Sequence, residues 1–336
     1  MLRIAFFLSL LAFPLQSLAQ IQVVTSFSIL GDLAHQIGGD KVNITNIVGP
    51  DQDAHVYSPT VGDARAVAGA DLIIFNGLGF ETWSTNLVAA SGTDAPIITV
   101  TDWLTSIGHS QGDEDKDHKA HDHDEDGHDE NEPHDEAEHS EHDDEGEKGH
   151  APEFHAHDHG MADPHAWGAL ANGLVYAQTI RDALIDLDPA NTVYYQDRFE
   201  TFASELEQTK QAFAGRIAAL PADHRTLVTT HDSFDYLAEE TGLVFLAAKG
   251  IHSGSSATAS QLRDLILQLR ELPHAALFVE NLTSPALIEQ IAKETGLAVG
   301  GRLYSDALSG PEGPAPTYLD MYRHNMETIL SALEAH

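Results

Sequence analysis

Short apolar segments alternate with segments of helical periodicity in two separate stretches of this 336-residue chain, and this alternation limits the fold more than any other feature. Residues 71–76 (DLIIFN) form a continuous apolar run, which is typical of a strand buried on both faces of a parallel sheet. Repeated strand–helix alternation predicts an α/β fold with mostly parallel sheets. We expect strands at residues 21–25, 42–48, 71–76 and 97–100, and again at 226–230, 243–247, 275–280 and 297–299.

A long amphipathic segment separates the two alternating stretches. Its apolar residues recur every three, four or seven positions, as on one helix face: Phe199, Phe202, Leu206, Phe213, Ile217 and Leu220. A helix of this length is long enough to connect two lobes. We therefore predict two α/β lobes joined by one long, rigid helix, with an N-terminal lobe at 20–187, a bridging helix at 188–220 and a C-terminal lobe at 221–336.

Residues 109–159 differ from the rest of the chain in composition. They hold 12 of the 21 His, together with 21 Asp+Glu and 3 Lys, and so carry half of the formal net charge of −36. The segment has almost no apolar residues, so burial cannot offset the entropy of ordering it. We predict a disordered insertion within the N-terminal lobe. The acidic balance also argues against nucleic acid and anionic membranes as partners.

The N-terminus has the pattern of a secretory signal peptide. Arg3 precedes an apolar run at residues 4–13, and Ser17 and Ala19 fit a small-x-small cleavage site, with cleavage after Ala19. The run is too short to span a membrane. The sequence has no Cys, which argues against disulfides, thiolate metal sites and a lipid-anchored N-terminus. We expect residues 1–19 to be removed and the mature protein to be a soluble periplasmic protein without a lipid anchor.

Four metal-type side chains follow predicted strands or begin a helix: His55, His165, His231 and Asp306. Ligands of open parallel sheets bind beyond the carboxyl ends of the strands. Three imidazoles and one carboxylate, two from each lobe, would form a tetrahedral site of the kind that suits Zn²⁺. Such a set with four protein ligands closes the site, whereas catalytic zinc keeps an open position.

The segments around these residues resemble those of the zinc- and manganese-binding solute receptors of ABC importers, the zinc-uptake periplasmic proteins in particular. The resemblance rests on GPDQDAHVYSPT (49–60), DPHAW (163–167), THDSFDYLAEETGL (230–243), FVENLTSP (278–285) and YSDALS (304–309), in this order. It implies that His55, His165, His231 and Asp306 bind one tight Zn²⁺ in the cleft between the lobes. It also implies that the protein delivers zinc to a membrane permease and is not an enzyme.

The resemblance has two departures. Ala54 stands where the family usually has Pro, and residues 168–172 differ from the continuation that many members have after DPHAW. His rather than Glu at position 231 favours zinc, because an added carboxylate would suit the harder Mn²⁺. We expect Tyr57 and Trp167 to pack around the site and Glu280, at the end of a strand, to support it.

The insertion is predicted to collect zinc weakly beside the cleft. Its His residues are spaced two and four apart, so a flexible chain could wrap an ion with two or three of them. The candidates for these accessory sites are His121, His123, His155, His157 and His159.

Three alternatives stay open. A manganese receptor of the same fold would use His55, His165, Glu280 and Asp306. A periplasmic zinc buffer or chaperone would work through the His-rich segment. A zinc hydrolase would use Asp306 or Glu280 as general base, but neither H-E-x-x-H nor G-x-S-x-G occurs. For the receptor we expect a monomer, with the permease and a periplasmic zinc chaperone as its candidate partners.

Overall fold

The computed structural model describes residues 20–104, 162–250 and 257–335. The predicted signal peptide, the insertion at 109–159 and its five candidate accessory His lie outside these residues. Contacts between residues group the described segments on both sides of the insertion into one compact unit. Both sheets belong to this unit, and the contacts between their loops given below lie within it.

The first sheet is built from the N-terminal stretch. Its strands are β1 (Ile21–Phe27), β2 (Val42–Val48), β3 (Leu72–Phe75) and β4 (Ile97–Thr99). They run parallel in the order β2-β1-β3-β4. All four residues of β3 are buried, as its uninterrupted apolar sequence predicts. The crossovers are the helices α1 (Ser28–Gly38), α2 (Val61–Ala68) and α3 (Ser84–Ser91).

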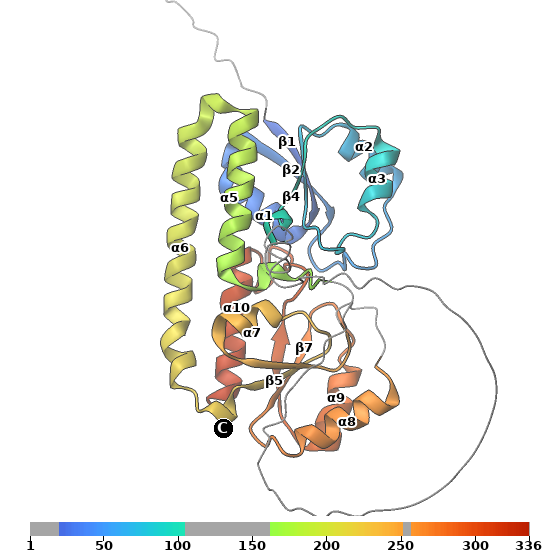
Figure 1. Ribbon diagram of the computed structural model, residues 1–336, viewed down its shortest axis with the longest axis vertical. Helices are drawn as coiled ribbons and strands as arrows, with labels where there is room; N and C mark the ends of the chain where they lie inside the picture. Colours follow the sequence, from blue (N-terminus) through green and yellow to red (C-terminus); the bar gives the residue numbers. More distant parts are fainter. Residues whose placement is uncertain (1–19, 105–161, 251–256, 336) are drawn as a thin grey trace, which may run out of the picture. The chain divides into compact units, whose positions relative to one another are not determined.

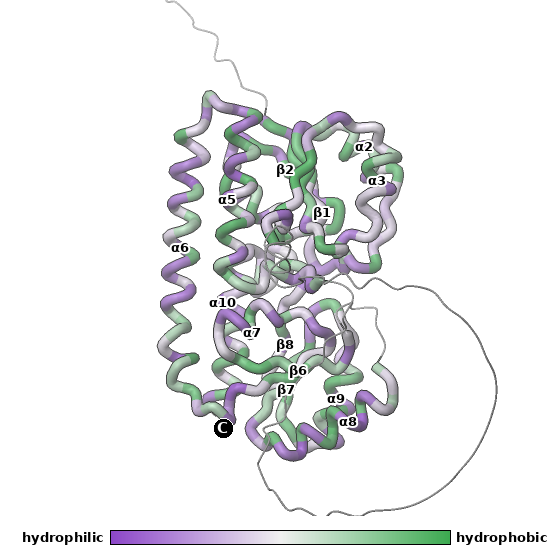
Figure 2. The backbone as a smooth tube through the Cα atoms, in the orientation of Figure 1, coloured by the Kyte–Doolittle hydropathy of each residue, from purple (hydrophilic) through white to green (hydrophobic). Residues whose placement is uncertain are grey.

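The second sheet repeats this topology after the long helix. Its strands are β5 (Thr226–Thr229), β6 (Val244–Ala247), β7 (Ala276–Glu280) and β8 (Val299–Leu303), all parallel in the order β6-β5-β7-β8. Helices α7 (Asp235–Thr241), α8 (Ala259–Leu269) and α9 (Ala286–Thr295) connect them. Figure 2 shows apolar residues concentrated along β6 and β7.

The last strand differs from the expectation of a short strand at 297–299. It extends to Leu303, and its pairing with β7 is irregular between Leu277 and Phe278. Glycine normally weakens a strand, but this part of β8 needs glycine at both position 300 and position 301. A Cβ at Gly300 would lie 2.7 Å from the Phe278 ring, and Gly301 has a φ of 148°. Because β8 runs to Leu303, Asp306 lies only three residues beyond the carboxyl end of the strand.

Two long helices follow the insertion, α5 (Leu170–Leu187) and α6 (Thr192–Ala219), and α10 (Tyr318–Leu333) ends the fold. Polar and apolar residues mix along α6 (Figure 2), which has 28 residues and is about 42 Å long. Early in α6, Arg198 Nε donates to the Gln36 carbonyl at the end of α1 (2.7 Å). Near its last turn, Arg216 pairs with Glu334 and Glu327 of the α10 region.

The α6 helix is therefore bonded both to a helix of the first sheet and to the helix that packs on β8 (Figure 1). The prediction of an α/β fold with two parallel sheets and one long helix is confirmed. Within the described residues, no helix combines the length and the apolar character needed to cross a membrane.

Candidate metal centre

Each of the four predicted ligands lies just beyond an element that positions it. His55 lies in the loop after β2, and His165 directly precedes the short 3₁₀ helix Ala166–Gly168. His231 follows β5, and Asp306 lies three residues after β8. The structure brings all four together, with their ligand atoms within 4.8 Å of one another.

The distances in this group match the needs of one metal ion. His55 Nε2 lies 3.2 Å from His165 Nε2, and His231 Nε2 lies 3.1 Å from Asp306 Oδ2. Asp306 Oδ1 is 3.5 Å from His165 Nε2. Metal–ligand bonds of about 2.0–2.1 Å in a tetrahedron place neighbouring ligand atoms about 3.4 Å apart. These three pairs are thus close to the spacing that a tetrahedral ion requires, and all four ligand atoms lie within 4.8 Å of one another.

The ligand side chains are removed from solvent. The His55 side chain is 2% exposed and those of the other three are 0% exposed. Apart from the ion-pair contacts between the ligands themselves, both carboxylate oxygens of Asp306 and His231 Nε2 are buried without a hydrogen-bond partner among the described residues. Buried polar atoms left in this condition are costly unless something else satisfies them, and a cation at the centre would do so. The group is a buried site of three His and one Asp that fits a divalent metal.

Carboxylates hold the far side of two of the imidazoles. Glu280 pairs with His231 Nδ1, and its Oε1 accepts the backbone N–H groups of Thr230 (2.7 Å) and His231 (2.9 Å). Asp163 Oδ1 lies 2.6 Å from His165 Nδ1 and accepts the His165 backbone N–H (2.9 Å). Such partners fix the ring orientation and turn Nε2 toward the metal.

The charges around the site shift the pKa values of its members in different directions. Burial lowers the pKa of His55 to about 4, and the neighbouring His165 and His231 add to this, although Asp306 opposes it. Burial also acts to lower the pKa of His231, but the negative charges of Asp306 and Glu280 outweigh it and raise that pKa well above its usual value. Burial acts to raise the pKa of Asp306, and His231 and the other imidazoles reverse this and hold it below its usual value.

The residues expected to support the site do so in different ways. Glu280 contacts a ligand directly, as described above. The Trp167 ring stands edge-on to His165, with centroids 5.3 Å apart, and its Nε1 donates to the Ser305 carbonyl (2.9 Å), next to Asp306. Tyr57 donates to Asp63 and packs on Trp83, whose Nε1 in turn donates to the Ala54 carbonyl. Tyr57 therefore acts on the loop that carries His55.

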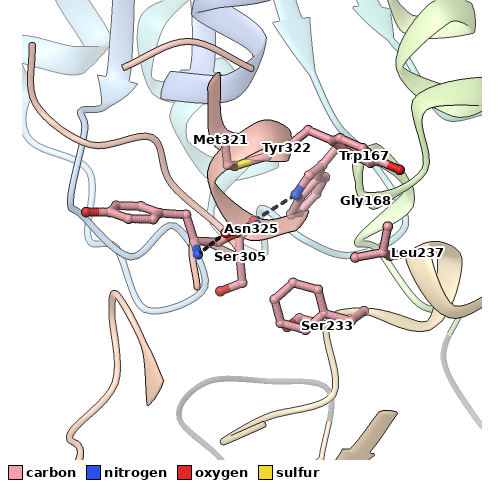
Figure 3. Close-up of a pocket in the computed structure, with 10 residues that line it drawn as sticks. Trp167, Gly168, Ser233, Leu237, Ser305, Met321, Tyr322 and Asn325 are labelled. Carbon is pink, nitrogen blue, oxygen red and sulfur yellow. Dashed lines mark hydrogen bonds between the residues drawn. The ribbon is translucent and has the colours of Figure 1, made fainter. Parts of the chain in front are cut away.

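A cavity lies beside the segments that carry three of the ligands, His165, His231 and Asp306 (Figure 3). Trp167, Ser233 and Ser305 are among its lining residues. The hydroxyls of Ser233 and Ser305 are buried and have no hydrogen-bond partner among the described residues. Water commonly satisfies such groups, so we expect ordered water in this cavity.

The sequence analysis missed three residues near the site. Asp163 and Asp53 each stand two positions before a ligand His, and each accepts that residue's backbone N–H at 2.9 Å. The signal was present, because an Asp side chain that bonds its own chain two residues on is a common turn motif. The spacing Asp-x-His occurs at both His55 and His165. Phe80, whose ring centroid is 4.6 Å from that of His55, had no such signal.

Comparison with known proteins gives consistent matches over nearly the whole chain. The family described as Zinc-uptake complex component A periplasmic (ZnuA) matches residues 23–332. The iron-binding protein YfeA of Yersinia pestis is 30% identical over 316 residues, which are 94% of this chain and 87% of that protein. The metal ABC transporter substrate-binding lipoprotein SloC of Streptococcus mutans serotype c is 26% identical over 320 residues, 94% of this chain and 90% of that protein.

A solved structure is similar to the same extent. The Mn-bound periplasmic metal binding protein from Candidatus Liberibacter asiaticus has a TM-score of 0.72 and 30% sequence identity, and the match covers 94% of this chain and 100% of that chain. The names of this family and of these similar proteins refer to zinc, iron and manganese. They agree on metal binding and differ in the metal.

Proposed function

The chain belongs to the family of periplasmic zinc-uptake components, and from this premise we propose that it captures Zn²⁺ at His55, His165, His231 and Asp306 and delivers it to an ABC permease. As a family member it is a metal-binding, non-enzymatic, extracytoplasmic substrate-binding component of an ABC transporter. The observation that carries the proposal is the convergence of four buried ligand atoms within 4.8 Å of one another.

The donor set supports zinc over manganese. Three imidazole nitrogens and one carboxylate suit Zn²⁺, whereas Mn²⁺ prefers a larger share of oxygen ligands. The manganese alternative requires Glu280 in place of His231. Glu280 is engaged with the Nδ1 side of His231 and with two backbone N–H groups, and it is not in the four-ligand group.

Protons compete with the metal for this site. Zinc binds the neutral imidazole, so His231, with its raised pKa, must release a proton when the ion enters. We expect zinc affinity to weaken as pH falls, and the loss should begin above pH 6.5, the ordinary pKa of His, because the pKa of His231 is raised. Docking to the permease and small movements of the second half would then release the ion.

A competition titration with a zinc chelator tests the proposal. The wild-type chain should bind one tight equivalent of Zn²⁺, and His231→Ala should lose it. His35→Ala is the matched control, since His35 is an exposed His on α1, and it should keep the tight equivalent. Circular dichroism establishes that each variant is folded. Retention of the tight equivalent in folded His231→Ala would contradict the ligand set, and tighter binding of Mn²⁺ than of Zn²⁺ would favour the manganese receptor.

The His-rich insertion remains a predicted accessory zinc collector. Deletion of residues 109–159 should remove weak equivalents and leave the tight one. If the deletion removes the tight equivalent, the protein is a zinc buffer that works through this segment. Replacement of His157 and His159 together should slow loading without changing the affinity of the tight site.

The predicted location also calls for a test. N-terminal sequencing of the exported protein checks cleavage after Ala19, and fractionation checks that it is free of the membrane. Sedimentation of the purified protein checks the predicted monomer.

A further inference from the structure

A second group of metal-type side chains lies in the C-terminal half, away from the site described above. Among the described residues, two sets of His and carboxylate groups have ligand atoms within 4.8 Å of one another, and the second set is Asp223, His224 and His274. We propose that Asp223, His224 and His274 form a further binding site for a divalent transition metal of the imidazole-preferring kind, Zn²⁺ first. Neither the family resemblance nor the four-ligand site accounts for these residues.

The topology of the second sheet places this group at the end opposite to the first site. His224 closes the 3₁₀ helix Ala222–His224 just before β5, and His274 lies in the turn just before β7. These two strands are parallel neighbours, with Leu227 opposite Ala276 (Figure 1). Their amino ends therefore bring His224 and His274 together, while their carboxyl ends carry His231 and Glu280. At about 3.3 Å per residue, strands of four and five residues separate the two ends by about 13–17 Å.

The two imidazoles lie close enough to share one ion after side-chain rotation. Their ring centroids are 4.1 Å apart and the ring planes differ by 22°. The rings are stacked face to face, and a nitrogen of each lies within 4.8 Å of the other and of an Asp223 carboxylate oxygen. Each ring must turn about its side-chain bonds before both nitrogens point at one ion. Zinc bonds of about 2.0–2.1 Å require ligand atoms about 3.4 Å apart. Closing the remaining gap is a matter of side-chain rotation, because Asp223 is exposed and both His are only partly buried.

The chemistry of the group differs from that of the four-ligand site. Three protein ligands leave the fourth position of a tetrahedral ion open to water. Partial exposure also weakens the electrostatic attraction between the ion and Asp223. We therefore expect the site to bind zinc more weakly than the buried set and to disfavour Mn²⁺, which prefers oxygen ligands. An ion here would clamp the segment that enters β5 to the turn that enters β7.

Site-resolved NMR of the full chain tests this inference. The Cε1–Hε1 signals of His224 and His274 are assigned from single Ala variants, and free zinc is buffered from the level that saturates the four-ligand site up to millimolar levels. Both signals should shift together. In His274→Ala the His224 signal should stop responding, whereas in the control His35→Ala both should respond as in wild type. Asp223→Asn should raise the zinc concentration at the midpoint about tenfold.

Two outcomes would overturn the inference. Either the two signals do not respond to zinc, or the His224 response is unchanged in His274→Ala. The test is independent of the first site. In His231→Ala, which removes a proposed ligand of the buried set, the paired response of His224 and His274 should persist.

Discussion

His55 and His231 are both buried imidazoles aimed at the same carboxylate, yet their pKa values move in opposite directions. Burial lowers the pKa of His55 to about 4, and the main opposing charge, Asp306 at 3.7 Å, does not reverse this. The pKa of His231 rises because it contacts two carboxylates, Glu280 at Nδ1 and Asp306 at Nε2. The number of carboxylates in contact with each ring, rather than burial, decides its charge in the metal-free protein.

The two halves also support their ligands differently. In the first half, Asp53 and Asp163 hold His55 and His165 from two residues away. In the second half, Glu280 holds His231 from the neighbouring strand, 49 residues along the chain. A buried carboxylate with two successive backbone N–H donors exists in the first half as well, since Glu81 accepts from Asn76 (2.7 Å) and Gly77 (3.1 Å). It contacts no ligand, and burial raises its pKa despite these hydrogen bonds.

Among variants that keep all four ligands, the largest effect is expected from Glu280→Gln. It removes the charge on the Nδ1 side of His231, so zinc affinity should fall about 10–100-fold and the pKa of His231 should drop. Chelator competition measures the affinity, and NMR titration of the His231 ring measures the pKa. An affinity equal to that of wild type would show that the carboxylate does not tune the site.

Below pH 6.5, the pH dependence of the free energy of unfolding reports on His55. Its folded pKa is lowered to about 4 from the unfolded value of 6.5, so its stabilising contribution is present above pH 6.5 and is lost as pH falls toward 4. Relative to His55→Gln, the free energy of unfolding of the metal-free wild type should fall by about 3 kcal/mol over this range. The difference between the two proteins is the measure, because Asp232, with a pKa raised to about 6, acts in the opposite direction. A flat difference would contradict the lowered pKa.

Above pH 6.5, the pH dependence of the free energy of unfolding reports on His231. Its folded pKa is raised, so its contribution is fully present below pH 6.5 and is lost as pH rises above that value. Relative to His231→Gln, the metal-free wild type should lose stability between pH 6.5 and higher pH. Urea unfolding at a series of pH values measures the free energy of unfolding both below and above pH 6.5. If the stability of wild type relative to His231→Gln grew as pH rises above 6.5, the raised pKa of His231 would be contradicted.

A smaller loss is expected from Asp163→Ala. His165 loses the partner of its Nδ1, but Asp163 is 18% exposed, so water can take its place in part. Zinc affinity should fall about tenfold. Asp53→Ala is the matched comparison in the other Asp-x-His segment. A larger loss than in Glu280→Gln would mean that local support matters more than support across the sheet.

The smallest effect on zinc is expected from Glu81→Gln. Glu81 contacts no ligand, so affinity should stay close to that of wild type. The free energy of unfolding should fall by about 1–3 kcal/mol, because the new amide N–H₂ faces a buried backbone donor. Isothermal titration and urea unfolding separate the two readouts, and a large affinity loss would show that Glu81 acts on the site.

Much of the fold was predictable from local pattern. For example, the start of α2 is marked in the sequence by Thr60 and Asp63, which form a reciprocal capping arrangement. Residues 166–187 have the pattern of one continuous helix, but in the structure a 3₁₀ turn at Ala166–Gly168 precedes α5. That turn is set by tertiary contacts, since Trp167 donates to Ser305 and Tyr318 Oη donates to the Trp167 carbonyl. A pattern of side chains along one segment carries no information on such contacts.

The sequence by itself determined the strand–helix alternation, the four metal-type residues beyond strand or helix ends, and the Asp-x-His spacing. These depend on neighbours in the chain, where backbone geometry and periodicity act. Only the tertiary structure decided that Glu280 contacts His231 rather than joining the four-ligand group, that β8 runs through two glycines, and that His224 meets His274. Each of these depends on pairing between strands far apart in the chain, because the register of a sheet, not the local sequence, selects which side chains meet.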